Sequence, residues 1–255
     1  MLGDQRFDHF FEPIETVLEI RFKIAEIHQA AHDDALYRRE LTEIVRIDAD
    51  AGPARTARTR TFAGRAALVL ADRVYQEFAD VKLRQPFESS LQEKKQRMDA
   101  AVEAMDRLVT YEIAEVTAAA TYYMAEIYFD FSRSLAESER PTDLKPADMA
   151  EYEAALDEEA FPFEEKAIRF HEKNLELLRK GVFNAWIEKS LGRLAVMMPG
   201  RYAKPEVSSG FLGAIDSYVY RSPVPPAPTP VGPAKKTPPA PAAVDDSQVE
   251  HDGAP

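Results

Sequence analysis

The stretch from Tyr111 to Pro199 constrains the fold of this chain most, because it is a succession of amphipathic segments with helical periodicity. Residues 118–135 at its centre are apolar around most of a helical circumference and begin with three consecutive alanines. The charged residues in and beside this segment form only a narrow stripe: Glu115, Glu126, Asp130, Arg133 and Glu137. A helix so largely apolar packs against neighbours on several sides, and small residues let those neighbours approach closely. The sequence therefore predicts an all-α protein with residues 118–135 at the centre of its packing.

Further helical segments precede this stretch. Val17, Ile20, Ile24, Ile27 and Ala31 recur at helical spacing and give the first segment an apolar face. A second segment follows, which Asp33 or Asp34 can cap, and the run DADAGP at 48–53 ends it. The pattern predicts helical hairpins at about 10–50, 65–109 and 111–180, and a final helix at 184–198 that Asn184 caps.

Two breaks are expected inside this pattern. Residues 54–65 carry Arg55, Arg58, Arg60 and Arg65, and we interpret them as a solvated loop leading into the first turn of a helix rather than as a phosphate-binding patch. Pro162 is expected to interrupt an acidic helix, because proline removes a helical hydrogen bond. The helical pattern is expected to begin again at Phe163.

Charge and composition exclude several classes of function. The net charge of −12 argues against nucleic acid as a partner and favours a basic protein partner. The chain has no cysteine, which excludes thiolate metal sites and disulfides. Residues 1–10 lack the pattern of a signal peptide, and no run is long enough for a membrane span. On these observations alone, the chain is expected in the cytoplasm.

Candidate chemical sites are few. His28 and His32 stand at the i,i+4 spacing at which two imidazoles on a helix can bind one metal ion. No third His or Cys is nearby, so we interpret them as part of a half-exposed polar edge of the helix. His171 lies among apolar neighbours and is expected at the edge of the core, hydrogen-bonded to a neighbour. Phosphate-binding loops and nucleophile motifs are absent from the sequence. We therefore predict a non-enzymatic protein without cofactors.

Aromatic and acidic residues are the best candidates for binding a protein partner. Tyr123 and Trp186 each sit beside the apolar stripe of their helix, where an aromatic side chain can anchor a bound segment. Glu158 and Glu159 belong to an acidic helix at about 148–159 that could meet a basic partner. These four residues form the predicted binding surface.

Three segments of the chain carry a resemblance to a known family. YEIAEVTAAATYYMAEIYFDFSRSL, ALDEEAFPFEEKAIRFHEKN and FNAWIEKSLGRLAVMMPGRYAKPE resemble the C-terminal region of large bacterial tetratricopeptide-repeat (TPR) proteins. Such proteins accompany energy-transducing systems of the TonB/ExbB/ExbD type or gliding-motility-like systems at the cell envelope. The resemblance covers about residues 65–205. Trp186, Leu191 and Gly192 only approximate the aromatic, Leu and Gly of the repeat signature.

The resemblance implies a TPR-like α-solenoid of antiparallel helical hairpins that acts as a protein–protein interaction scaffold, with a TonB/ExbB/ExbD-like envelope component as partner. The helical-repeat domain would span 1–205, followed by a short docking segment at 206–221 and a disordered Pro/Ala-rich tail at 222–255. If the chain is part of a longer secreted precursor, its location is periplasmic. The alternatives are a closed helical bundle that binds a small ligand or metal ion, and a homo-oligomeric structural role.

Overall fold

The computed structural model describes residues 13–203, and within that range the fold is all-α, as predicted. Its helices are α1 (Ile14–Ala30), α2 (Asp34–Asp50), α3 (Ala57–Ala79), α4 (Phe87–Val109), α5 (Ala114–Ala136), α6 (Pro146–Arg179), α7 (Ala185–Met197) and α8 (Pro199–Tyr202), with a 3-10 turn, η1 (Gly52–Ala54). The predicted docking segment at 206–221 and the predicted disordered tail at 222–255 lie outside the described residues. Among the helices of residues 13–203, none combines the length and the apolar character that crossing a bilayer requires.

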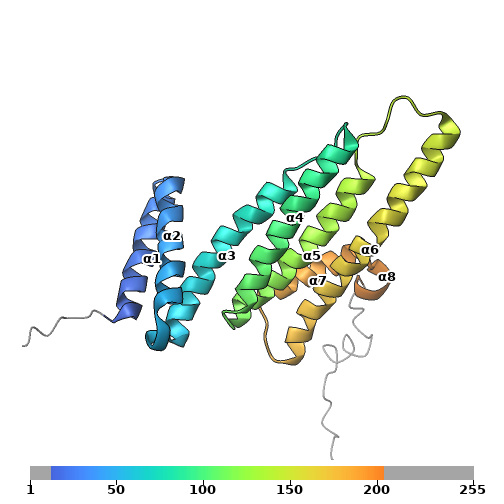
Figure 1. Ribbon diagram of the computed structural model, residues 1–255. Helices are drawn as coiled ribbons and strands as arrows, with labels where there is room; N and C mark the ends of the chain where they lie inside the picture. The colour runs from blue at the N-terminus through green and yellow to red at the C-terminus, as the bar shows by residue number, and fades with distance from the viewer. Residues whose placement is uncertain (1–12, 204–255) are drawn as a thin grey trace, which may run out of the picture. The chain divides into compact units, whose positions relative to one another are not determined.

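Consecutive helices lie side by side (Figure 1), and each contacts the next one along the chain. The odd-numbered helices also contact one another in order, α1 with α3, α3 with α5, and α5 with α7. From α2 to α7, each helix therefore packs against both of its neighbours along the chain. This order places α5 between α3, α4, α6 and α7.

The prediction that residues 118–135 form the centre of the packing is confirmed. Ala118, Ala119 and Ala120 are fully buried, and Ile127 and Phe131 are buried in the core that α3, α4, α5 and α6 share. A second, smaller core joins α1, α2 and α3, and the Tyr111 ring packs against both cores. Burial of small residues on α5 lets the neighbouring helices approach its backbone.

The predicted apolar face of the first helix is wrong. Ile20, Ile24 and Ile27 are 48%, 37% and 66% exposed, whereas Leu18 and Ala25 are buried. The helix carries a second apolar row, formed by Leu18, Phe22 and Ala25 at i, i+4 and i+7, and that row faces α2 and α3. Periodicity alone does not choose between two apolar rows on one helix.

Arginines near the start of α3 have a structural role. The helix begins at Ala57, earlier than predicted, because Thr56 and Thr59 form a capping box there. The four arginines then pair with carboxylates of neighbouring segments: Arg55 with Asp48, Arg58 with Glu19, Arg60 with Glu112, and Arg65 with Glu115. Residues 57–65 are therefore helical rather than a solvated loop.

Pro162 does not interrupt its helix, contrary to the prediction. Helix α6 continues from Pro146 to Arg179 through Pro162. Packing against α5 holds both halves: Ala160 is buried in the core on one side of the proline, and the Phe163 ring packs at a tilt against that of Phe131 on the other, with ring centroids 4.5 Å apart. The hydrogen bond that the proline removes lies on an exposed stretch, where water can replace it.

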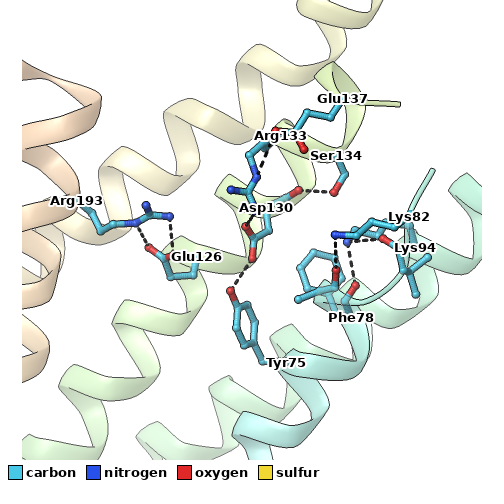
Figure 2. Close-up of polar contacts among 12 residues, drawn as sticks. Tyr75, Phe78, Lys82, Lys94, Glu126, Asp130, Arg133, Ser134, Glu137 and Arg193 are labelled. Carbon is cyan, nitrogen blue, oxygen red and sulfur yellow. Dashed lines mark hydrogen bonds and ion pairs between the residues drawn. The ribbon is translucent and has the colours of Figure 1, made fainter. Parts of the chain in front are cut away.

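A buried lysine holds the end of α3. Lys94 of α4 is 1% exposed, and its Nζ donates to the backbone oxygens of Phe78, at 2.9 Å, and Val81, at 3.0 Å. The ammonium also lies 4.0 Å from the centre of the Phe78 ring. Figure 2 shows Lys94 and Phe78 together beside the polar residues of α5. Lys94 thus gives the carbonyls at the end of α3 a side-chain donor, in addition to the Val81 N–H that already donates to the Phe78 oxygen.

The stability of the protein is expected to rise with pH between about 8 and about 10. Burial lowers the pKa of Lys94 from 10.5 to about 8. In that interval the unfolded chain binds this proton and the folded chain does not, so raising the pH favours folding. Chemical denaturation across this range measures the effect. Lys94→Met is expected to abolish the rise, and an equal rise in that variant would contradict the assignment to Lys94.

Candidate functional site

Between α3 and α7 lies a polar groove over one face of α5. A pocket of about 550 Å³ opens there, and we call it the α5 pocket. Its lining comes from α3, the α3–α4 connection, α5 and α7: Tyr75, Ala79, Asp80, Lys82, Leu83, Tyr122, Glu126, Asp130, Arg133, Ser134, Glu137 and Arg193. Figure 2 shows Glu126 and Asp130 on α5, with Arg193 reaching Glu126 and Tyr75 reaching Asp130. The polar stripe of the central helix from Glu126 to Glu137 therefore forms the floor of the pocket.

Glu126 forms the best-defined ion pair of the site. Its two carboxylate oxygens accept hydrogen bonds of 2.7 Å from Nε and Nη2 of Arg193, the two-pronged geometry that makes Arg–carboxylate pairs strong. His171 Nε2 lies 3.3 Å from Glu126 Oε1. Burial alone would raise the pKa of Glu126, but the contacts with His171 and Arg193 outweigh it and hold that pKa below 4.5. Glu126 is therefore ionised at neutral pH and joins α5 to α7.

Asp130 has weaker charge compensation than Glu126. Its Oδ2 accepts a 2.5 Å hydrogen bond from the Tyr75 hydroxyl, and its Oδ1 accepts a 3.1 Å bond from Nη2 of Arg133. Burial, together with the hydrogen bond to Asp130, raises the pKa of Tyr75, so this phenol remains a neutral donor. The only cation bonded to Asp130 among the described residues is thus Arg133, whose side chain is half-exposed.

The two predicted aromatic anchors lie together. The rings of Tyr123 and Trp186 have centroids 5.4 Å apart, and Tyr122 lies 5.6 Å from Trp186. Tyr75 extends the group, with its ring 5.1 Å from that of Tyr123. The Tyr123 hydroxyl donates to Asp72 Oδ1 at 2.6 Å, which fixes its ring. These four residues, which we call the aromatic cluster, border the α5 pocket, because Tyr75 and Tyr122 also line it.

The predicted acidic residues belong to another part of the molecule. Glu158 and Glu159 are exposed on α6. Glu159 lines a separate pocket of about 330 Å³, together with residues of α4 and α5 such as Phe87 and Phe131. The structure therefore brings Tyr123 and Trp186 together but does not bring Glu158 and Glu159 to them.

The two N-terminal histidines do not share a helical face. His28 lies in the last turn of α1, whereas His32 lies beyond the helix end with a positive φ of 57°. The i,i+4 relation that would point both rings at one ion is lost where the chain turns toward α2. Residues 13–203 contain no group of three or more His, Cys, Asp or Glu side chains that could hold a metal ion.

A buried hydrogen-bonding chain joins α5, α6 and α7 beneath the groove. His171 Nδ1 lies 3.3 Å from Ser190 Oγ, and its Nε2 faces Glu126. The serine, histidine and acid of a hydrolase triad are thus in sequence, but with the two ring nitrogens exchanged. Here Ser190 and His171 are fully buried, and Asn174 donates to Ser190 Oγ at 2.9 Å. The hydroxyl has no exposed surface for a substrate to reach. His171 is hydrogen-bonded to a neighbour as predicted, but it lies inside the core rather than at its edge.

The sequence pattern pointed to Tyr123 and Trp186 of the aromatic cluster but to none of the residues that line the α5 pocket. Tyr75, Glu126, Asp130 and Arg193 were not among the predicted binding residues. One signal was present in the sequence: two carboxylates one turn apart on a helix that is otherwise apolar. Such residues either face solvent or are buried with partners, and only the neighbouring helices decide between these outcomes.

Searches against protein-family models, curated proteins and solved structures found no significant match.

Proposed function

We propose that this protein is a non-enzymatic interaction scaffold that binds a polypeptide segment on the face formed by α3, α5 and α7. The observation that carries the proposal is that the aromatic cluster and the α5 pocket lie next to each other on that face and share Tyr75 and Tyr122. Aromatic anchors beside a pocket are the arrangement that dominates binding energy at protein interfaces.

The groove is preformed, which favours binding. Hydrogen bonds to Asp72 and Asp130 fix the rings of Tyr123 and Tyr75, and Trp186 packs against two tyrosines. Lys189 also lies over the Trp186 ring, with its Nζ 4.1 Å from the ring centre. Side chains held in this way lose little conformational freedom when a partner arrives, so more of the contact energy appears as affinity.

The fold agrees with the proposed scaffold role. Helices that pack consecutively, with alternate helices also in contact, expose extended surfaces that repeat proteins use for binding. We extend the proposal to a TPR-like α-solenoid whose partner is a component of a TonB/ExbB/ExbD-type or motility-type envelope assembly. This extension rests on the resemblance of residues 65–205 to such proteins, and a periplasmic location follows only from it.

A second candidate function is the binding of a small polar ligand in the α5 pocket. The volume of about 550 Å³ favours it, because it falls within the range of small-molecule sites. The two candidates differ in what the aromatic cluster does. A polypeptide crosses the pocket and contacts Trp186 as well, whereas a small ligand is held by the pocket residues alone.

Replacing Trp186 by alanine is expected to weaken polypeptide binding by about thirtyfold, the loss typical of an interface anchor. The ligands for this test are peptides selected from a random phage-displayed library on the full chain. Their dissociation constants are then measured by calorimetry. Phe183→Ala is the matched control, because Phe183 precedes α7 and is 73% exposed. We expect it to change the affinity less than twofold.

Two outcomes would contradict the proposal. In one, the library yields no peptide that binds the chain specifically. In the other, the selected peptides bind Trp186→Ala as tightly as the parent chain while that variant keeps its helical circular dichroism.

A further inference from the structure

Asp130 is a buried carboxylate whose negative charge is only partly balanced by neighbouring cations. It is 8% exposed at the floor of the α5 pocket, yet its fixed partner is a neutral phenol, Tyr75. Its cationic partner, Arg133, stands three residues further along the same helix and makes one 3.1 Å contact. A buried charge is stabilised most when a cation pairs with it closely and with good geometry. Asp130 therefore attracts a better-placed cation.

The other charges of the pocket support the same conclusion. Both oxygens of Glu126 accept hydrogen bonds from Arg193. If Arg193 moved to pair with Asp130, the buried carboxylate of Glu126 would lose its cation. Arg133 is half-exposed and also lies 3.9 Å from Glu137, which can hold it away from Asp130. Lys82 also lines the described pocket, but its Nζ contacts the backbone oxygen of Ala79 at 3.5 Å rather than a carboxylate. Of the two pocket arginines, Arg133 is thus the one that can move out at little cost.

The carboxylates are buried and held by other helices, whereas the competing cation is half-exposed. Glu126 and Asp130 are held on α5 by bonds from α7 and α3, and the rings of Tyr75 and Tyr122 stand beside them. An acidic side chain entering the pocket would face two buried carboxylates. A basic side chain would meet the same carboxylates with an attractive charge.

We infer that the α5 pocket receives a lysine or arginine side chain of the bound polypeptide, whose charged head displaces Arg133 and pairs with Asp130. This inference rests on the proposed function and names the side chain that the groove selects. The pocket volume of about 550 Å³ is ample for one such side chain. The net charge of −12 draws basic segments toward the chain and acts in the same direction.

The inference predicts the composition of selected peptides. Random phage-displayed peptides selected on the full chain are expected to share one lysine or arginine at a fixed distance from an apolar residue. Replacing that basic residue by glutamine is expected to weaken binding to the parent chain by at least tenfold. In Asp130→Asn, which keeps the shape of the side chain and its acceptor for Tyr75, the same peptide change is expected to alter affinity less than twofold. Asp106→Asn, at an exposed position of α4, is the matched control and is expected to retain the full tenfold effect.

A second variant separates the inference from simple loss of folding. Arg133→Ala removes the competing cation, so it is expected to strengthen binding of the basic peptides severalfold, a gain that misfolding does not produce. Selected peptides without a shared basic residue, an undiminished glutamine effect in Asp130→Asn, or weaker binding to Arg133→Ala would each overturn the inference. If those peptides still depend on Trp186, the scaffold proposal survives; if no peptide is selected, the scaffold proposal itself fails.

Discussion

Replacing Phe131 by alanine is expected to lower the free energy of unfolding by about 4 kcal/mol, the largest stability effect that we predict. Phe131 is 1% exposed in the core of α3, α4, α5 and α6, and its ring meets that of Phe163, with centroids 4.5 Å apart. Truncation removes this contact and leaves a cavity that rigid helices on all sides cannot close. Urea denaturation followed by circular dichroism measures the loss.

Phe183→Ala provides the matched comparison for this change. The same atoms are deleted from a residue that is largely exposed, so we expect a change within about 0.5 kcal/mol. Equal losses in the two variants would show that α5 is not the centre of the packing.

Replacing Arg193 by methionine is expected to cost about 3 kcal/mol at neutral pH, because it leaves the buried Glu126 carboxylate without its main partner. Methionine retains part of the contact that the arginine makes with Phe129, whose ring centre lies 4.7 Å from the guanidinium. The charge, rather than packing, is therefore what the change removes. Arg169→Met, which breaks an exposed pair with Glu165 on one helix, is the control and is expected to cost less than about 0.5 kcal/mol.

The pH dependence of the Arg193 effect has a defined sign. The pKa of Glu126 lies below 4.5 in the folded chain, so the stability that its contacts contribute is present above that value. It is lost as the pH falls through the depressed folded pKa. The difference in stability between the parent chain and Arg193→Met should therefore narrow in acid. A difference that stays constant down to pH 3 would mean that the effect comes from packing. Adding Glu126→Leu to Arg193→Met should recover most of the loss, since the carboxylate that lost its partner is then removed as well.

Local signals in the sequence predicted parts of the fold well. The nearly uniform apolar surface of residues 118–135 identified the central helix, and the caps at Asp33 and Asn184 form as expected. Each of these features depends on the chain's own neighbourhood, which is why periodicity and capping rules were sufficient.

Features that depend on neighbouring helices were not predictable in the same way. The choice between the Ile20 and Leu18 rows of α1 was made by where α2 and α3 pack. The continuity of α6 through Pro162 was decided by packing on α5, which outweighs one lost hydrogen bond. Local propensity and periodicity do not contain either of these facts.

The candidate site likewise has a part that the sequence pattern indicates and a part that depends on how distant helices pack. Tyr123 and Trp186 could be recognised as aromatic residues beside an apolar stripe, whereas the partners of Glu126 and Asp130 come from distant parts of the sequence. Arg193 follows Glu126 by 67 residues, and Tyr75 precedes Asp130 by 55. A polar pocket built from three helices therefore becomes visible only once the helices are packed.

Fluorescence of Trp186 tests the central claim most directly, because it is the only tryptophan in the sequence and it lies in the proposed groove. Titrating the full chain with a tryptophan-free peptide selected on it is predicted to shift or quench the emission. The change should saturate at the dissociation constant that calorimetry gives. Binding in calorimetry with no change in Trp186 emission would place the peptide elsewhere and contradict a binding face formed by α3, α5 and α7.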